Sequence, residues 1–557
     1  MGWDGQELGL GARGVAAPTP NGVSDVQAMQ AALNAANAAG LPLDLYGGTY
    51  VFTAIGGGLV VPSRQLIRCF APTTFLGHLD PSGAYSATNV LLWCPSTYTA
   101  GATTNAAVVA SSKHFGSTTL IPDNTWVFLT TADTFWVWQR KVLSHTGAGP
   151  YVYTMDEPIT ENLATAAPVN VIVQQPHDIT IEGNNMLTLT GTGAAYMLLY
   201  RGRNVKMLDV RLDTTGGTPT GGLCLADFDQ GSRDCEFSGT TSGGQGFSMF
   251  SAEHCAIKGS KIYEIQDGGD YVQPQIDDCF ACTIDHTLFA GSNRGGSFGI
   301  EIGGQGGDGS YACAIRDSQF YGHETGILLS TCGSITMDGL DIAATVVGMT
   351  VAFGNEFSLG NSRIRLTSAA STVIGIQVST ACKFQVVGNT LITYTEPGAA
   401  DAIQIRAVYA HAAAAITFKG LHVNWGAAGS ALFVTFYLDA TGMVVLLDDV
   451  LVDGSNVAAS YDLVSSTGTA TVRYGNNVNL GATTNHIYGS LQLSRGTVQA
   501  NGTSPVDVAF SDLKASDRVV LSPVHAGRNP QITYTPGTKF TINALSGDTD
   551  IYPFAVI

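Results

Sequence analysis

Acidic residues gather in two nearby stretches of this 557-residue sequence. One stretch holds Glu264, Asp267 and Asp270, and the other holds Glu301 and Asp308. Hydrolysis of a glycosidic bond needs two carboxyl groups, one as acid and the other as base or nucleophile. We therefore predict that Glu301 pairs with Asp267 or Asp270, with Asp308 as a third catalytic candidate. The sequence does not show which carboxyl group has the raised pKa, so the acid and base roles stay open here.

Side chains suited to holding a sugar lie in the same two stretches. The predicted substrate contacts are Glu264, Tyr271, Arg294 and Tyr311. A polysaccharide lyase is the alternative enzyme, because elimination across a uronic acid needs a base and a cation that neutralises the carboxylate. Residues available for those roles are Lys258, Lys261, Tyr263, His286 and Arg294. Hydrolysis and elimination therefore both remain open at this point.

A repeated pattern brings such distant acids together. Two apolar residues alternate with other residues and are followed by a turn residue, with successive starts from Val205 to Phe357 about 20 to 31 residues apart. A period of this size is typical of a solenoid. The turn residue is of a type that tolerates a positive φ. These residues are Asp209, Gly239, Gly259, His286, Asp317, Gly339, Asn361 and Asn389.

A second pattern, glycine followed by apolar, any and apolar residues, alternates with the first. Its copies cover residues 222–225, 246–249, 299–302, 326–329, 348–351 and 375–378. Each coil therefore contains at least two short strands, which can pair only with the equivalent strands of the next coil. We predict an all-β chain built around a parallel β-helix. Glu301 is the exception in an outward column that otherwise holds neutral residues such as Cys224, and adjacent coils lie about 4.8 Å apart.

The composition of the chain argues against two classes of binding partner, nucleic acids and membranes. Charged residues make up 13% of the chain and the formal net charge is −18, which argues against nucleic acid as a partner. No stretch of about 18 apolar residues is present, so we expect no membrane span. A signal peptide is also not visible at Met1.

The cysteines and glycines do not indicate a cofactor. Cys235, Cys255 and Cys313 occupy the same column as Cys282, so we expect a ladder of reduced, buried thiols. The pair Cys279 and Cys282 is a lone CxxC, and residues 303–308 match a calcium-binding repeat only once. We therefore expect no metal ion and no cofactor.

Four regions follow from these patterns. Residues 1–52 hold a helix from Ser24 to Gly40, with Gln27 completing a capping box, and this helix is expected to cover the open end of the solenoid. Residues 53–176 are predicted to form a small β insertion or irregular early coils. Residues 177–478 form the catalytic β-helix. Residues 479–557, with strands about ten residues apart, are expected to form a β-sandwich that trimerises the chain or binds carbohydrate.

This arrangement resembles bacteriophage tailspikes. The segment 24–52, including Leu-Tyr-Gly-Gly-Thr-Tyr, looks like the opening of their pectate-lyase-like β-helix, and residues 496–557 are similar to a C-terminal sandwich of phage tail proteins. The resemblance implies a right-handed helix and a homotrimer that cleaves bacterial capsule, exopolysaccharide or O-antigen. It also implies a virion protein that is assembled in the host cytoplasm and attached through its N-terminus to a tail or baseplate protein. Almost nothing precedes Ser24, so we expect another tail protein, or a removed segment, to supply the usual virion-binding domain.

Two other classes of protein remain as alternatives. A non-enzymatic receptor-binding spike would bind the polysaccharide without releasing oligosaccharides. A secreted bacterial enzyme of the pectinase type would need a signal peptide, so the sequence disfavours it.

Overall fold

The computed structural model describes residues 14–52, 58–78, 90–94, 97–131, 136–160, 162–192, 195–214, 225–243, 246–265, 274–291, 297–304, 309–352, 354, 356–367, 372–379, 381–394, 404–410, 415–425, 432–438, 442–453, 460–464, 470–478, 487–488, 492–493, 495–499, 505–509, 519–521, 531–543 and 551–556. The chain divides into two compact units, residues 1–336 and residues 337–557. No helix among the described residues is long and apolar enough to cross a membrane.

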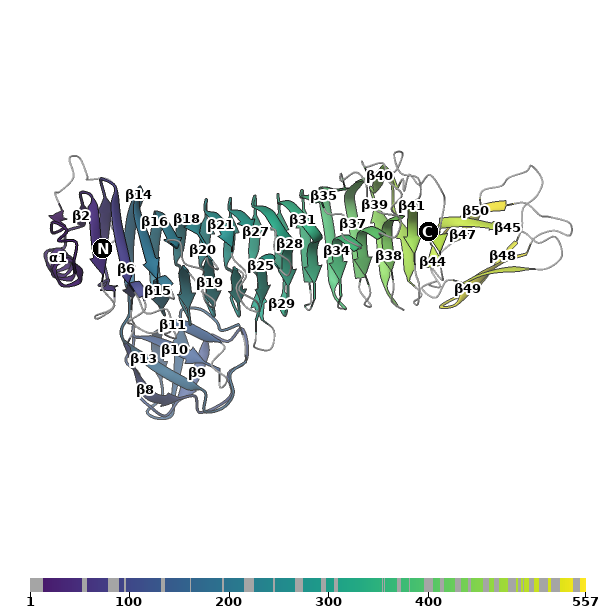
Figure 1. Ribbon diagram of the computed structural model, residues 1–557. Coiled ribbons are helices and arrows are strands. Elements are labelled where there is room, and N and C mark those ends of the chain that lie inside the picture. Colours follow the sequence, from purple (N-terminus) through teal and green to yellow (C-terminus); the bar gives the residue numbers. More distant parts are fainter. Residues whose placement is uncertain are drawn as a thin grey trace, which may run out of the picture. The chain divides into compact units, whose positions relative to one another are not determined.

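Helix α1 (Val26–Ala39) lies at the start of the first unit (Figure 1). Its apolar residues share one face at helical spacing and are buried, as predicted: Met29, Leu33 and Ala36. Gly40 ends the helix with a φ of 66°. The predicted capping box is wrong, because the N-cap is Asp25 and its side chain makes no capping bond. The Asp25 carboxylate instead accepts hydrogen bonds from the backbone N–H groups of Asn21 (2.9 Å) and Val51 (2.8 Å).

The first unit contains three columns of parallel strands, which we name A, B and C (Figure 1). Column A comprises β4 (Leu59–Val60), β7 (Val90–Cys94), β15 (Ala195–Tyr200), β17 (Ala226–Asp229), β19 (Phe247–Phe250), β22 (Gln275–Asp277), β25 (Phe298–Gly303) and the end of β28 (Gln319–Leu329). Column B comprises β2 (Leu43–Leu45), β5 (Leu66–Cys69), the beginnings of β14 (His177–Thr192), β16 (Arg203–Thr214) and β18 (Glu236–Ser242), and then β20 (Ala256–Lys258), β23 (Thr283–Asp285) and β27 (Ala314–Arg316). Column C comprises β3 (Gly48–Phe52), β6 (Thr73–His78), the ends of β14, β16 and β18, then β21 (Lys261–Ile265), β24 (Leu288–Gly291) and the beginning of β28. This is the predicted parallel β-helix, with three strands per complete coil.

The bends between columns B and C confirm the turn pattern. The five predicted residues in the first unit all have a positive φ: Asp209, Gly239, Gly259, His286 and Asp317. The interior is apolar, and the cysteine column is a stack of buried free thiols, formed by Cys235, Cys255, Cys282 and Cys313. Burial raises the pKa of the Cys255 thiol, which keeps it protonated.

A small antiparallel domain interrupts the early coils (Figure 1). Its strands are β8 (Thr97–Thr103), β9 (His114–Ser117), β10 (Trp126–Thr130), β11 (Val137–Thr146), β12 (Tyr151–Met155) and β13 (Pro168–Gln174). They enclose a core around Trp138 and Tyr153. The region 53–176 thus holds both regular coil strands, from β4 to β7, and this domain, which we name the insertion.

The second unit continues with parallel strands. The strands are β31 (Asp341–Val351), β32 (Glu356–Gly360), β33 (Arg363–Leu366), β34 (Thr372–Val378), β35 (Lys383–Tyr394), β36 (Gln404–Ala410), β37 (Ala415–Trp425), β38 (Leu432–Leu438), β39 (Val444–Asp448), β40 (Leu451–Asp453), β41 (Ser460–Val464), β42 (Thr471–Tyr474), β43 (Ile487–Tyr488) and β44 (Gln492–Leu493). Gly339 and Asn361 have the predicted positive φ. The prediction for Asn389 is wrong by one residue, because Phe357 lies opposite Phe384 and Gly388 takes the positive φ of 68°.

Two antiparallel sheets end the second unit. One contains β45 (Arg495–Gln499), β50 (Ile551–Val556) and β47 (Val519–Leu521), and the other contains β46 (Val506–Ala509), β49 (Lys539–Asn543) and β48 (Gln531–Thr535). Val519 and Phe554 of the first sheet share a core with Phe540 and Ile542 of the second. The two sheets therefore form the predicted β-sandwich.

Candidate active site

Four acidic side chains occupy outward positions of column A. Alternation along each strand turns Phe228 and Ile276 into the core and their neighbours outward. The strand register aligns Asp227, Ser248, Gln275 and Glu301 in one outward row. It aligns Phe250, Asp277 and Gly303 in a second row, and continuing the register of β17 by one residue places Asp229 at the start of this row. We name Asp227, Asp229, Asp277 and Glu301 the acidic strip.

Glu301 is half-buried and held in place from the next coil. The Ser330 hydroxyl donates a 2.6 Å hydrogen bond to its Oε1 atom. Its backbone N–H donates to the Pro274 carbonyl of the preceding coil at 2.9 Å. Glu301 therefore presents a positioned carboxyl group on the outside of the β-helix.

Asp277 lies on the strand that pairs with the strand of Glu301, directly opposite Gly303. Strands are about 4.8 Å apart and rise about 3.3 Å per residue, so the two Cα atoms lie about 8 Å apart. Burial, then Glu301 and Asp278, raise the pKa of Asp277 to about 7. Two carboxyl groups on adjacent coils, one of which is still partly protonated near neutral pH, are the groups that glycoside hydrolysis requires.

Asp278 fixes the bend that follows Asp277. It is fully buried, its φ is 52°, and its N–H donates to the Gly303 carbonyl at 3.1 Å. A Cβ atom at Gly304 would lie 2.2 Å from the Asp278 Oδ1 atom, so only glycine fits there. The end of the strand that carries Asp277 is therefore anchored to the strand that carries Glu301.

The other predicted residues are placed differently. Asp267, Asp270, Tyr271, Arg294 and Asp308 lie outside the described residues. Glu264 belongs to β21 in column C, whereas Glu301 belongs to column A. Tyr311 on β26 (Ser310–Tyr311) is 42% exposed, and its ring stacks on Phe280 at a centroid distance of 6.5 Å. Of the predicted catalytic residues, Glu301 is thus the one that the structure describes.

Three of the four acids of the acidic strip were not predicted from the sequence. The coil of Asp277 has Pro274 where the second pattern expects glycine, so the pattern skipped it. The copy at residues 222–225 was placed too early, because Asp227 and not Cys224 lies opposite Ser248. The alternation of Gln275, Ile276 and Asp277, counted back one coil length from Glu301, was the signal that could have found the pair.

One described group of side chains has metal-ligand types. Asp285, His286 and Asp317 lie within 4.8 Å of one another at the bend between columns B and C. The His286 ring contacts both carboxylates, with 2.8 Å from Nδ1 to Asp285 and 3.8 Å from Nε2 to Asp317. The imidazole is 68% exposed. Nothing besides ligand type indicates a metal ion there.

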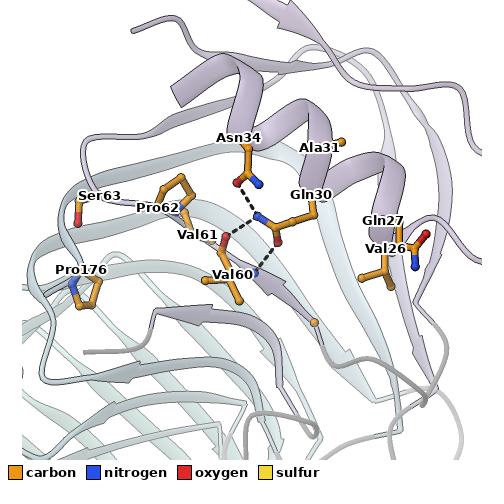
Figure 2. Close-up of a pocket in the computed structure, with 11 residues that line it drawn as sticks. Val26, Gln27, Gln30, Ala31, Asn34, Val60, Val61, Pro62, Ser63 and Pro176 are labelled. Carbon is orange, nitrogen blue, oxygen red and sulfur yellow. Dashed lines mark hydrogen bonds between the residues drawn. The ribbon is translucent and has the colours of Figure 1, made fainter. Parts of the chain in front are cut away.

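A pocket of about 700 Å³ lies beside helix α1 (Figure 2). Gln30 crosses it and pairs with Val60 through both backbone groups, at 2.9 Å each. The lining contains no titratable side chain. This pocket therefore offers no acid or base, and the acidic strip remains the candidate active site.

Comparison with known proteins identifies the fold. No protein-family model matches the sequence, and no curated protein sequence matches it. The tailspike of Acinetobacter baumannii bacteriophage AP22, solved with an A. baumannii capsular saccharide, matches with a TM-score of 0.51 and 11% identity over 96% of this chain and 94% of that chain. The tailspike of Pseudomonas phage phi297 matches with a TM-score of 0.52 and 13% identity over 95% of this chain and 92% of that chain. The chain therefore shares the parallel β-helix fold of phage tailspikes over nearly its whole length.

Proposed function

We propose that this protein is a phage tailspike depolymerase, which binds a bacterial surface polysaccharide and cleaves it by endo-glycosidic hydrolysis. The observation that carries the proposal is the pair Asp277 and Glu301. A carboxyl group with a pKa of about 7 lies beside a second carboxyl group on the outer face of a β-helix. The tailspike fold supports a long carbohydrate as the substrate.

Asp277 is the general acid in this proposal. Its raised pKa leaves about half of the molecules protonated at pH 7, so it can protonate the glycosidic oxygen as the bond breaks. Glu301, fixed by Ser330, either takes a proton from the water that attacks the anomeric carbon, or attacks this carbon itself to form an intermediate that water then hydrolyses. Residues 266–273 precede β22 and residues 305–308 follow β25, so Asp267, Asp270 and Asp308 stay candidates for the same site.

The lyase reaction is less well supported. Elimination needs a cation beside the uronate carboxylate. The described residues of the two outward rows that carry the acidic strip include neither lysine nor arginine. Those described residues are Asp227, Asp229, Ser248, Phe250, Gln275, Asp277, Glu301 and Gly303. Asp229, which is mostly ionised at neutral pH, would repel a uronate, so hydrolysis fits the site better.

The tailspike fold also supports the remaining assignments. We propose that the protein is a homotrimer in the virion tail, is assembled in the host cytoplasm and attaches through its N-terminus to another tail protein. Light scattering of the purified protein should then give a mass of about three times 58.0 kDa. A monomer at micromolar concentration would contradict this part of the proposal.

The catalytic proposal is tested by two isosteric variants. We expect Asp277→Asn and Glu301→Gln each to lower kcat by about 10²–10⁴-fold, because each removes a group that transfers a proton or attacks in the transition state. The assay follows oligosaccharide release from purified capsular and O-antigen polysaccharides by mass spectrometry. Asp317→Asn, an exposed acid at another bend, is the matched control and should keep full activity. Full activity of Asp277→Asn would remove the acid assignment.

A further inference from the structure

We propose that Asp227 and Asp229 form a binding subsite for an uncharged sugar residue of the same polysaccharide. This inference rests on the proposed function. Both acids lie on β17, two residues apart, so their side chains leave the same face of the strand. The subsite takes a sugar that offers a hydrogen-bond acceptor beside a donor, such as two neighbouring hydroxyl groups or an acetamido group.

The burial of Asp227 is the first observation. Asp227 is 5% exposed, and the described residues give its carboxyl group no hydrogen-bond partner. Buried polar groups in proteins are nearly always hydrogen-bonded, because an unpaired one loses its bonds to water. The flanking residues Ala226 and Phe228 turn into the core, so Asp227 points away from it. A bound sugar would supply the hydrogen-bond partner that this carboxyl group does not have among the described residues.

Asp229 supplies the complementary group. The backbone N–H of Gln230 hydrogen-bonds to its carboxyl group and Arg201 attracts it, and both effects favour ionisation. The Arg201 guanidinium is fixed by stacking at 4.7 Å from the ring centres of Tyr98 and Phe128 in the insertion. Burial raises the pKa of Asp229, but only to about 6. At neutral pH this residue is therefore mostly a carboxylate that accepts hydrogen bonds.

Asp227 is the donor of the pair. Burial, followed by the charge of Asp229, raises the pKa of Asp227 well above its usual range. A protonated carboxyl group donates one hydrogen bond, which a carboxylate is unable to do. The two side chains thus present one donor and one acceptor on a single face. A uronic acid placed here would meet the negative charge of Asp229, so the subsite selects against it.

The position of the subsite relates it to the cleaved bond. Asp227 and Glu301 share one outward row and are separated by three strand spacings. At about 4.8 Å per spacing this is about 14 Å. A polysaccharide lying along the acidic strip would therefore be cleaved at Asp277 and Glu301 while a sugar several units away contacts Asp227 and Asp229.

The test measures binding in a chain that does not cleave. In the Asp277→Asn background, titration calorimetry with defined neutral, N-acetylated and uronic-acid-containing bacterial oligosaccharides gives the dissociation constants. We expect Asp227→Ala and Asp229→Ala to weaken binding of the preferred oligosaccharide by about tenfold, the loss of roughly one or two hydrogen bonds. Asp227→Asn is the matched variant, because its amide is neutral and still donates, and we expect it to bind within about threefold of the Asp277→Asn parent.

The outcomes separate this inference from the catalytic proposal. Equal affinity of Asp227→Ala and its parent would overturn the subsite, as would tighter binding of oligosaccharides with a uronic acid at this position. If Asp227→Ala lowers the melting temperature, the dissociation constants of the other two variants still decide the question. Binding by Asp229→Ala that is as tight as binding by Asp227→Asn and by the Asp277→Asn parent would overturn the subsite. Cleavage by the Asp277→Asn parent would contradict the catalytic proposal instead, and the binding comparison would then be made in a Glu301→Gln parent.

Discussion

Two of the regions in which the first unit buries charged side chains differ in how those charges are matched. Where the insertion meets the coils, Arg140 and Glu253 have side chains only 1% and 3% exposed and form a two-pronged ion pair at 2.5 and 2.8 Å. Arg140 also donates to the carbonyls of Gln139 at 2.7 Å and Pro158 at 2.6 Å. The buried charge is fully matched, and the pair holds the insertion in place.

The acidic strip is the opposite case. Burial raises the pKa of Asp277 to about 7 and that of Asp229 to about 6, and among the described residues Arg201, beside Asp229, is the cation that acts against this effect. Paired charges at the insertion stabilise one arrangement of the chain. Carboxyl groups that are buried without such partners keep protons that chemistry can use, and this difference separates a structural anchor from a candidate active site.

Mutation of the ion pair between Arg140 and Glu253 should cause the largest change in the free energy of unfolding. Glu253→Gln leaves the buried Arg140 charge without its hydrogen-bonded counterion, with only the more distant Asp156 and Glu157 to attract it, and we expect the free energy of unfolding to fall by about 3–5 kcal/mol. Replacing both residues by methionine should restore most of this loss, because no unpaired charge remains. Urea unfolding followed by tryptophan fluorescence measures both effects.

The control for this prediction is an exposed ion pair of the same unit. Lys258 lies 3.0 Å from Glu236, and its side chain is 48% exposed. Lys258→Met should therefore change the free energy of unfolding by less than about 1 kcal/mol. Equal effects of Lys258→Met and Glu253→Gln would show that the buried pair is no anchor.

Replacing a buried acid of the acidic strip should raise the free energy of unfolding, whereas breaking the Arg140–Glu253 pair should lower it. The pKa of Asp277 is higher in the folded chain than its ordinary value of 3.8, so its ionisation costs stability as the pH rises from about 4 through about 7. Asp277→Asn has no such cost. We expect this variant to match the wild type near pH 4 and to exceed its free energy of unfolding by about 1–3 kcal/mol at pH 8. A variant less stable than the wild type at pH 8 would contradict the uncompensated burial of Asp277.

The periodic part of the fold was predictable from the sequence. A residue with a positive φ recurs in each coil, and Asp209, His286 and Asp317 marked those bends because few residue types tolerate that backbone conformation. The cysteine ladder followed from the same register. The pattern gave the wrong residue at Asn389, where a neighbouring glycine, Gly388, takes the bend at lower cost.

The candidate site was only partly predictable. Glu301 stood out because an acid interrupts an otherwise neutral column. Asp277 did not, because its coil begins with Pro274 and its strand is only three residues long. Asp227 and Asp229 were not predicted either. The irregular length of their coil shifts the strand register, so the sequence pattern placed the outward position too early. Sequence patterns therefore give the rows of a solenoid, but the coil lengths decide which side chains become neighbours.

One measurement tests the central claim most directly: digestion of a polysaccharide that the wild type cleaves, carried out in water enriched in heavy oxygen. Hydrolysis by Asp277 and Glu301 predicts one heavy oxygen at each new reducing end and none at the new non-reducing ends, and it predicts no fragments from Asp277→Asn or Glu301→Gln, although both variants still bind the polymer. Unlabelled, unsaturated fragments from the wild type, or normal fragments from either variant, would contradict the account.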